Sequence, residues 1–155
     1  MSYGPDASKE YLRSAVLTAS PEQLQLMLLD GAIRFTTRGL EALRQNQLEA
    51  MFNAMDRAQR IALELGNGLR REANPQLFDQ MVAVYDFVFR RLVDATMQRD
   101  VQAAEEALKI LRHQRETWAI LAEKVKQHPQ PEAAGKARPG EVGGEVEESR
   151  FVAEG

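Results

Sequence analysis

The spacing of apolar residues changes along the chain, and its first regular stretch predicts a helix of about Pro21–Arg44. Ser20 can accept hydrogen bonds from the free amides of the first turn, and a proline suits the first helical position. Gln23 stands where a capping box places Glu or Gln, so the start of this helix is well defined. Strand patterns, in which apolar and polar residues alternate, are nearly absent from the sequence.

Three more helices are predicted at short intervals after the first. The second begins near Leu48, the third at Pro75 behind the capping residue Asn74, and the fourth behind Asp100. Their expected inner faces are Met51, Met55, Ala58, Ala62, Leu65 and Leu69; then Phe78, Met81, Tyr85, Val88 and Leu92; then Val101, Ala104, Leu108, Leu111, Trp118, Leu121 and Val125. Links of a few residues between long helices favour antiparallel neighbours. The sequence therefore predicts an all-α fold, an antiparallel up-down four-helix bundle.

The two ends differ from this middle part. Residues 128–155 are rich in Pro, Gly and Glu, with Phe151 almost the only large apolar residue, so we expect a disordered tail. Residues 1–19 carry enough apolar side chains to dock on another surface, with room for one extra helix, but too few to fold alone. Those side chains are Tyr11, Leu12, Val16 and Leu17. We therefore expect an N-terminal lid segment at 1–19, a bundle at 20–127 and a tail at 128–155.

The first predicted helix carries more apolar residues than a single core contact requires. On a helical wheel they form two stripes on nearly opposite sides: Leu24, Leu28, Gly31 and Phe35 on one, and Leu26, Leu29, Ile33 and Leu40 on the other. Either the bundle buries this helix on two sides, or one stripe belongs to a binding surface. Phe52 and Leu63 lie off the seam of the second helix, and Phe87 lies opposite the core stripe of the third. An aromatic ring among charged residues is costly to leave in water, which favours an interaction role for Phe87.

Composition excludes several classes of protein. The formal net charge is −3 and the basic residues are interleaved with acidic ones, which disfavours nucleic acid as the main partner. The absence of cysteine excludes disulfides, thiolate catalysis and cysteine-ligated zinc. No stretch approaches the length of a membrane span and the opening residues do not resemble a signal peptide, so we expect no membrane insertion and a cytoplasmic location.

Candidate chemistry is sparse. His113 and Glu116 stand one helical turn apart, a spacing that a metal site in a bundle could use, but such a site needs a matching motif on a facing helix. The other histidine, His128, stands at the start of the tail, so we interpret the pair as exposed polar residues. No glycine-rich phosphate loop follows a strand, and nothing marks an activated nucleophile with its base. We predict no enzyme, no cofactor, no metal and no catalytic residue.

Several separate blocks of sequence together resemble the FliS family of flagellar export chaperones. The matching blocks are Tyr11, Val16 and Thr18-Ala19-Ser20-Pro21-Glu22-Gln23-Leu24; Met27-Leu28-Leu29-Asp30-Gly31-Ala32-Ile33; Val84-Tyr85-Asp86-Phe87-Val88-Phe89-Arg90-Arg91-Leu92; and Trp118 after Arg115-Glu116-Thr117. They follow one another in register from about Tyr11 to Val125. Leu29 departs from the usual tyrosine and Ser14 from a frequent asparagine, and the tail has no counterpart.

The resemblance implies a helical bundle that binds flagellin in the cytosol, holds its C-terminal segment and prevents premature polymerisation before type III export. It also implies that the N-terminal segment can lie over the client site, and that the flagellar export gate is a further candidate partner. For the chain itself we expect a monomer or a weak homodimer. The candidate client-binding residues are Tyr11, Val16, Leu26, Leu29, Ile33, Phe52, Leu63, Phe87 and Phe89.

Two other classes of function stay open at this point. A homo-oligomeric structural bundle would bury the surplus apolar surface against a copy of itself and have no flagellin client. An enzyme or metal-binding bundle is the other class, and only the spacing of His113 and Glu116 points to it.

Overall fold

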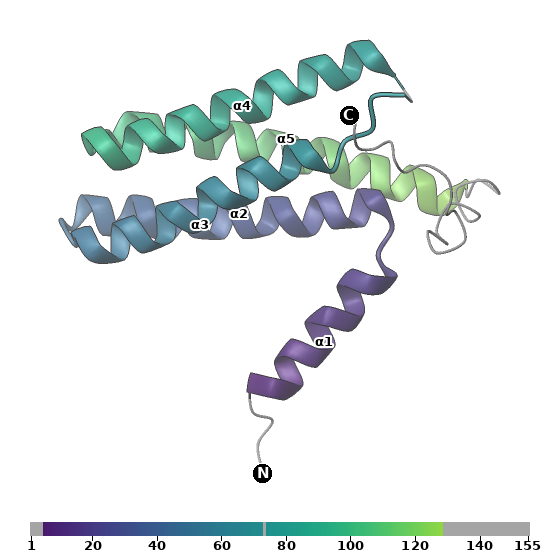
Figure 1. Ribbon diagram of the computed structural model, residues 1–155, viewed down its shortest axis with the longest axis horizontal. Coiled ribbons are helices and arrows are strands. Elements are labelled where there is room, and N and C mark those ends of the chain that lie inside the picture. Colours follow the sequence, from purple (N-terminus) through teal and green to yellow (C-terminus); the bar gives the residue numbers. More distant parts are fainter. Residues whose placement is uncertain (1–4, 73, 129–155) are drawn as a thin grey trace. The chain divides into compact units, whose positions relative to one another are not determined.

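The structure is a computed structural model that describes residues 5–72 and 74–128. These residues form five helices: α1 Pro5–Thr18, α2 Pro21–Arg44, α3 Leu48–Asn67, α4 Pro75–Gln98 and α5 Val101–Gln127 (Figure 1). The chain divides after Ala119, within α5, into two compact units, and the packing described below concerns the residues up to that division. The predicted tail lies, from residue 129 on, outside the described residues.

The helix starts follow from local side-chain chemistry, as the sequence predicted. Ser20 Oγ accepts a hydrogen bond from the backbone amide of Gln23 at 3.1 Å, and Gln23 Oε1 accepts one from the Ser20 amide at 3.0 Å, which completes the capping box. Asn74 and Asp100 each accept a hydrogen bond from the backbone amide three residues later, both at 3.1 Å. The possible extra helix expected within residues 1–19 is present as α1.

Helices α2 to α5 form a closed antiparallel ring. Links of a few residues reverse the chain between successive helices, and a side-chain contact joins each neighbouring pair. The contacts are Gln25 Nε2 to the Leu65 carbonyl (α2–α3, 3.2 Å), Gln59 Nε2 to Thr96 Oγ1 (α3–α4, 3.0 Å), Arg91 Nε to Glu106 Oε1 (α4–α5, 2.9 Å), and Arg115 Nε to Asp30 Oδ1 (α5–α2, 2.6 Å). The prediction of an antiparallel up-down four-helix bundle is therefore confirmed.

The core contains most of the inner faces expected for α3 to α5. Up to the division in α5, the expected residues that are buried are Met51, Met55, Ala58, Ala62, Leu65, Tyr85, Val88, Leu92, Ala104, Leu108 and Leu111. Those that are partly buried against them are Leu69, Met81, Val101 and Trp118. The sequence located these seams because their apolar residues recur at the helical period without interruption.

The seam of α2 lies between the two stripes that the sequence predicted. The buried positions Gln25, Leu29, Thr36 and Gly39 belong to one row with alternating steps of four and three, which Ala32 and Leu43 complete. Leu29 is 0% exposed, so its placement on a surface stripe was wrong. The error has a physical reason: three positions of the true seam hold glutamine, threonine and glycine, so apolar character alone does not mark it.

Gly39 lets α2 and α3 approach each other closely. A β-carbon at this position would stand 2.8–2.9 Å from three side-chain atoms of Met55, which is itself fully buried. Gly66 in α3 is different, because a β-carbon there would meet no atom within 4 Å. Substitution by alanine adds the same methyl group at either position, but only the one at residue 39 conflicts with another side chain.

We expect Gly39→Ala to destabilise the bundle by about 1–2 kcal/mol, because overpacking of about 1–3 kcal/mol outweighs the gain in helix propensity. Gly66→Ala should instead stabilise it by up to about 1 kcal/mol. Urea melts of both variants measure the difference. Equal effects of the two substitutions would show that Met55 can move aside at no cost.

A buried polar relay connects α4 to α5. Trp118 Nε1 donates to the hydroxyl of Tyr85 at 2.9 Å, and that hydroxyl donates to Gln114 Oε1 at 3.1 Å. Tyr85 and Gln114 are both buried, and burial raises the pKa of Tyr85 to about 12, although the hydrogen bond from Trp118 opposes the shift. The relay satisfies polar groups that would otherwise be buried without partners.

Removing the hydroxyl by Tyr85→Phe should cost about 1–3 kcal/mol, because it leaves the Gln114 acceptor buried and unpaired. Tyr85→Ala should cost about 3–5 kcal/mol, since it also opens a cavity.

The folded pKa of about 12 for Tyr85 exceeds the ordinary value of 10.0. The advantage of the wild type over Tyr85→Phe should therefore be fully present below about pH 10 and fall as the pH rises toward about 12. Denaturant melts across this range test the sign, and a constant difference would contradict it.

Candidate functional site

Exposed apolar side chains of α3 gather on its α4-facing side. Gln59 marks that side, because its amide donates to Thr96 of α4. Phe52 and Leu63 stand seven residues before and four residues after Gln59, so they share its face of the helix. Their side chains remain 45% and 51% exposed. The sequence placed both off the core seam, and the structure agrees.

The neighbouring side of α4 continues this apolar surface. Phe89 stands two turns before Thr96 and Val93 one turn before it, so both lie toward α3. Met97 directly follows Thr96 and lies about 100° farther round the helix, at the solvent-facing border of this surface. Because the helices are antiparallel, Leu63 of α3 comes opposite the turn of α4 that holds Phe89. We call Phe52, Leu63, Phe89 and Met97 the α3/α4 face.

Met97 is a member of the α3/α4 face that sequence reasoning missed. It is 74% exposed, and it ends the four-residue row that starts at Phe89. That row was a signal in the sequence that could have identified it.

Two other candidate residues lie on the opposite edge of the ring. Arg115 of α5 bonds Asp30, which marks the α5-facing side of α2, and this hydrogen bond raises the pKa of Arg115. Leu26 and Ile33, four residues before and three after Asp30, lie on the same side and are half-buried. They form what we call the α2/α5 face. The structure thus places Phe52, Leu63 and Phe89 along the α3/α4 edge of the ring, and Leu26 and Ile33 along the opposite edge.

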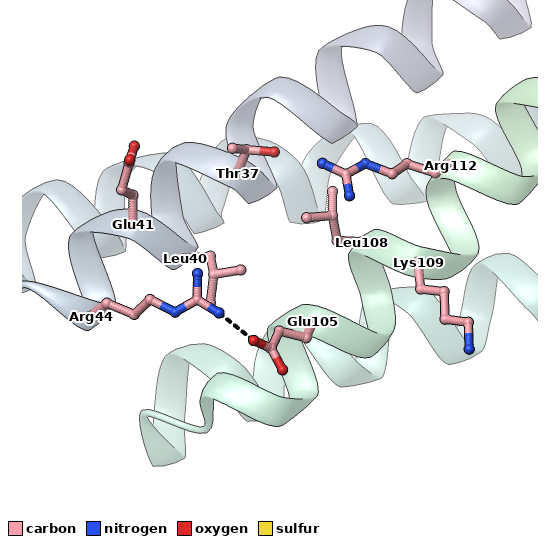
Figure 2. Close-up of a pocket in the computed structure, with 8 residues that line it drawn as sticks. All are labelled: Thr37, Leu40, Glu41, Arg44, Glu105, Leu108, Lys109 and Arg112. Carbon is pink, nitrogen blue, oxygen red and sulfur yellow. Dashed lines mark hydrogen bonds and ion pairs between the residues drawn. The ribbon is translucent and has the colours of Figure 1, made fainter.

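A hollow of about 430 Å³ adjoins the α2/α5 face farther along the same two helices (Figure 2). Its lining is Thr37, Leu40, Glu41, Arg44, Glu105, Leu108, Lys109 and Arg112. Figure 2 shows Arg44 reaching across to Glu105, with which it forms an ion pair, and the guanidinium of Arg112 pointing toward α2. The hollow combines an apolar floor of two leucines with a charged rim, an arrangement suited to a peptide rather than to a small reacting molecule.

Phe87 lies apart from both faces. Arg91, one turn after it, pairs with Glu106 of α5, so Phe87 lies on the side of α4 toward α5 and solvent. It is 42% exposed, which agrees with its predicted position outside the core stripe. A partner that contacts Phe87 and the α3/α4 face together would have to cross the outer surface of α4.

The remaining candidates divide between surface and core. Tyr11 and Val16 of α1 are exposed, Tyr11 at 77%, and their neighbours Leu12 and Leu17 are exposed as well. Helix α1 therefore presents an uncovered apolar surface. Leu29 lies in the core, as corrected above, and offers no contact surface in this conformation.

The described residues contain no group of three or more His, Asp or Glu side chains that could hold a metal ion. Within the same ranges, no helix is both long enough and apolar enough to cross a membrane. What the described surface offers is apolar area for a protein partner.

Comparison with known proteins gives consistent matches over the bundle. Residues 4–125 match the family model described as Flagellar protein FliS. The chain is 32% identical to the flagellar secretion chaperone FliS of Bacillus subtilis (strain 168), with 76% of this chain and 89% of the relative covered. It is 34% identical to the protein of the same name from Salmonella typhimurium, with 74% and 85% covered. It is 30% identical to that from Escherichia coli (strain K12), with 76% and 89% covered.

Phe87 and Phe89 should respond differently to truncation, although they are two residues apart. We expect Phe87→Ala to leave the free energy of unfolding within about 1 kcal/mol of the wild type, as exposed positions usually do. Phe89→Ala should cost about 2 kcal/mol or more, because its ring packs against the core. Urea melts of the two variants compare them directly. Equal losses would show that Phe87 is also part of the core.

Proposed function

The chain belongs to the FliS family of flagellar export chaperones, and from this we propose that it binds the C-terminal segment of flagellin in the cytoplasm before export. The membership also identifies the protein as a chaperone rather than an enzyme. The bound segment is kept from polymerising and remains competent for the flagellar type III export machinery.

The observation that carries this proposal is the α3/α4 face. Phe52, Leu63 and Met97 remain exposed beside the half-buried Phe89, and a surface without a partner rarely gathers so many apolar side chains. A segment that is unstructured when free can fold into amphipathic helices when it lays its apolar side on such a surface. Phe52 and Phe89 would serve as aromatic anchors, a role in which such residues are enriched.

The α2/α5 face supports an extended mode of binding. In a ring of four helices it lies on the edge opposite the α3/α4 face, so a single short helix cannot cover both. A client segment with two or more helices could run around the bundle and contact both edges. Such wrapping hides the apolar stripes that flagellin subunits would otherwise use to contact one another, and it requires neither nucleotide nor catalysis.

Helix α1 is assigned a covering role within the same proposal. Its exposed side chains, with Tyr11 and Val16 among them, form an apolar stripe that needs a partner surface. When no client is bound, α1 would shield apolar area of the bundle. When the client arrives, α1 would either leave or add Tyr11 as a direct contact.

Titration calorimetry with the C-terminal segment of the host flagellin tests the proposal. We expect the double variant Phe52→Ala/Leu63→Ala to bind about tenfold more weakly or worse, because it removes two exposed anchors from one face. Leu77→Ala is the matched control: Leu77 is 45% exposed, like Phe52, but belongs to neither face, and its affinity should stay within about twofold.

Three results would contradict the proposal. Equal weakening by the double variant and by Leu77→Ala would remove the α3/α4 face as the site. Unchanged binding of flagellin that lacks its C-terminal segment would show that another part of flagellin is held. A stable oligomer in light scattering that ignores flagellin would favour self-association as the purpose of the apolar surface.

A further inference from the structure

The third pair of neighbouring helices, α2 and α3, carries a cluster of arginines around one aromatic ring. Phe35 of α2 is half-buried, and the guanidinium carbons of Arg34, Arg38 and Arg57 lie 5.3, 5.4 and 5.3 Å from its ring centroid. Arg57 belongs to α3, so the cluster spans both helices. Each contact of this kind attracts the guanidinium charge to the face of the ring. The ring thus gathers three positive charges on one small surface.

These arginines differ from most of the others in the bundle. Across residues 5–72 and 74–128, no acidic side chain forms an ion pair with Arg34, Arg38 or Arg57. Arginines with an acidic partner within 4.0 Å are Arg44, Arg60, Arg71, Arg90, Arg91 and Arg115. Three like charges around one ring repel one another, and an anion placed among them would remove that repulsion.

A hollow next to the cluster adds further groups suited to an anion. Phe35, Arg38 and Arg57 line it on one side, and its lining extends to Gln47, the N-cap residue of α3. Gln47 makes no side-chain hydrogen bond to the first turn, so that helix start is not capped by its own side chain.

The lining of this hollow also contains two acidic residues. Asp56 is paired with Arg60 at 3.1 Å, so its charge is offset. Glu41 adds one negative charge to the same lining, against the three charges of the arginines. The surface around Phe35 therefore keeps an excess of two positive charges, in a chain whose formal net charge is −3.

We propose that this surface, the arginine face of Phe35, Arg34, Arg38 and Arg57, binds an acidic helix of a second protein partner. Arg34 and Arg38 are one turn apart, about 6 Å along the helix axis, which is also the spacing of carboxylates at positions i and i+4 of a partner helix. Arginine can hold each carboxylate in a bidentate pair, while the Phe35 ring provides apolar contact between them. Three charges on one face are too few for a nucleic-acid track, which favours a protein partner.

The arginine face is separate from the surfaces assigned to the client. It lies over α2 and α3, whereas the other two faces lie over α3 and α4 and over α2 and α5. A partner bound here leaves both client faces free, so the chaperone could be recognised by a second protein while it carries its client. This inference goes beyond the proposed function and does not require the client to be flagellin.

A synthetic helical peptide of about 18 residues, with glutamates at i and i+4 beside a leucine stripe, serves as the probe. Fluorescence anisotropy should show binding to the wild-type chain that weakens as NaCl rises from about 50 to about 300 mM. The triple variant Arg34→Gln/Arg38→Gln/Arg57→Gln should bind at least about tenfold more weakly. The matched control, Arg13→Gln/Arg70→Gln/Arg90→Gln, removes the same charge elsewhere and should stay within about twofold of the wild type.

Circular dichroism and thermal melts establish that both triple variants are folded, and binding of the flagellin segment should be unchanged in the arginine-face variant. Equal weakening in the two triple variants would overturn the proposal, because net charge alone would then explain the binding. Undiminished binding of a peptide with glutamine in place of glutamate would overturn it as well, since the carboxylates would not be recognised. Preference for a single-stranded oligonucleotide over the peptide would replace the protein partner with nucleic acid.

Discussion

The packing of α2 against α3 is the contact on which the rest of the bundle depends. It is fixed near one end by the hydrogen bond from Gln25 to the Leu65 carbonyl, and near the other by the approach of Met55 to Gly39. These two contacts set the register of the pair, because sliding either helix by one turn would separate both. Once the register is set, Gln59 of α3 meets Thr96 of α4, and α5 closes the ring through ion pairs to α2 and α4.

This register also determines which apolar residues of α2 are left over. The buried seam of α2 holds glutamine, threonine and glycine at three of its positions, and several of the large apolar side chains of α2 lie on either side of it. Leu28 and Phe35 lie toward α3, while Leu26 and Ile33 lie toward α5, and all four are half-buried. Helix α2 seemed too apolar for one contact because it has one buried row of residues and a half-buried apolar row on either side of it. The row toward α5 belongs to the α2/α5 face, and the row toward α3 includes Phe35, the aromatic ring of the arginine face.

In α4 the residues that hold the fold differ from most of those proposed for binding, Phe89 being the one with both roles. In α4, Tyr85, Val88 and Leu92 are buried and hold the fold, whereas Phe87 and Met97 are exposed. A rigid core under an apolar surface lowers the entropic cost of capturing a flexible segment, because only the client has to become ordered. A chaperone that acts by binding alone needs this separation, since its surface must stay open while the fold remains intact. The three proposed surfaces lie over different pairs of helices, so under these proposals the chain could hold more than one partner at a time.

The sequence by itself determined the helices, their starts and three of the four core seams. These depend on neighbours in the chain: the Ser20–Gln23 capping box, the Asn74–Pro75 start and the uninterrupted period of α3 are local signals. It also identified Phe52, Leu63 and Phe87 as exposed, because each departs from a clear seam. Only the tertiary structure decided that Leu29 is buried, that Phe89 lies on the α3 side of α4, and that Arg57 meets Phe35. Those outcomes depend on the register between helices, which is set where Gly39 admits Met55, and the spacing within a single helix does not contain that information.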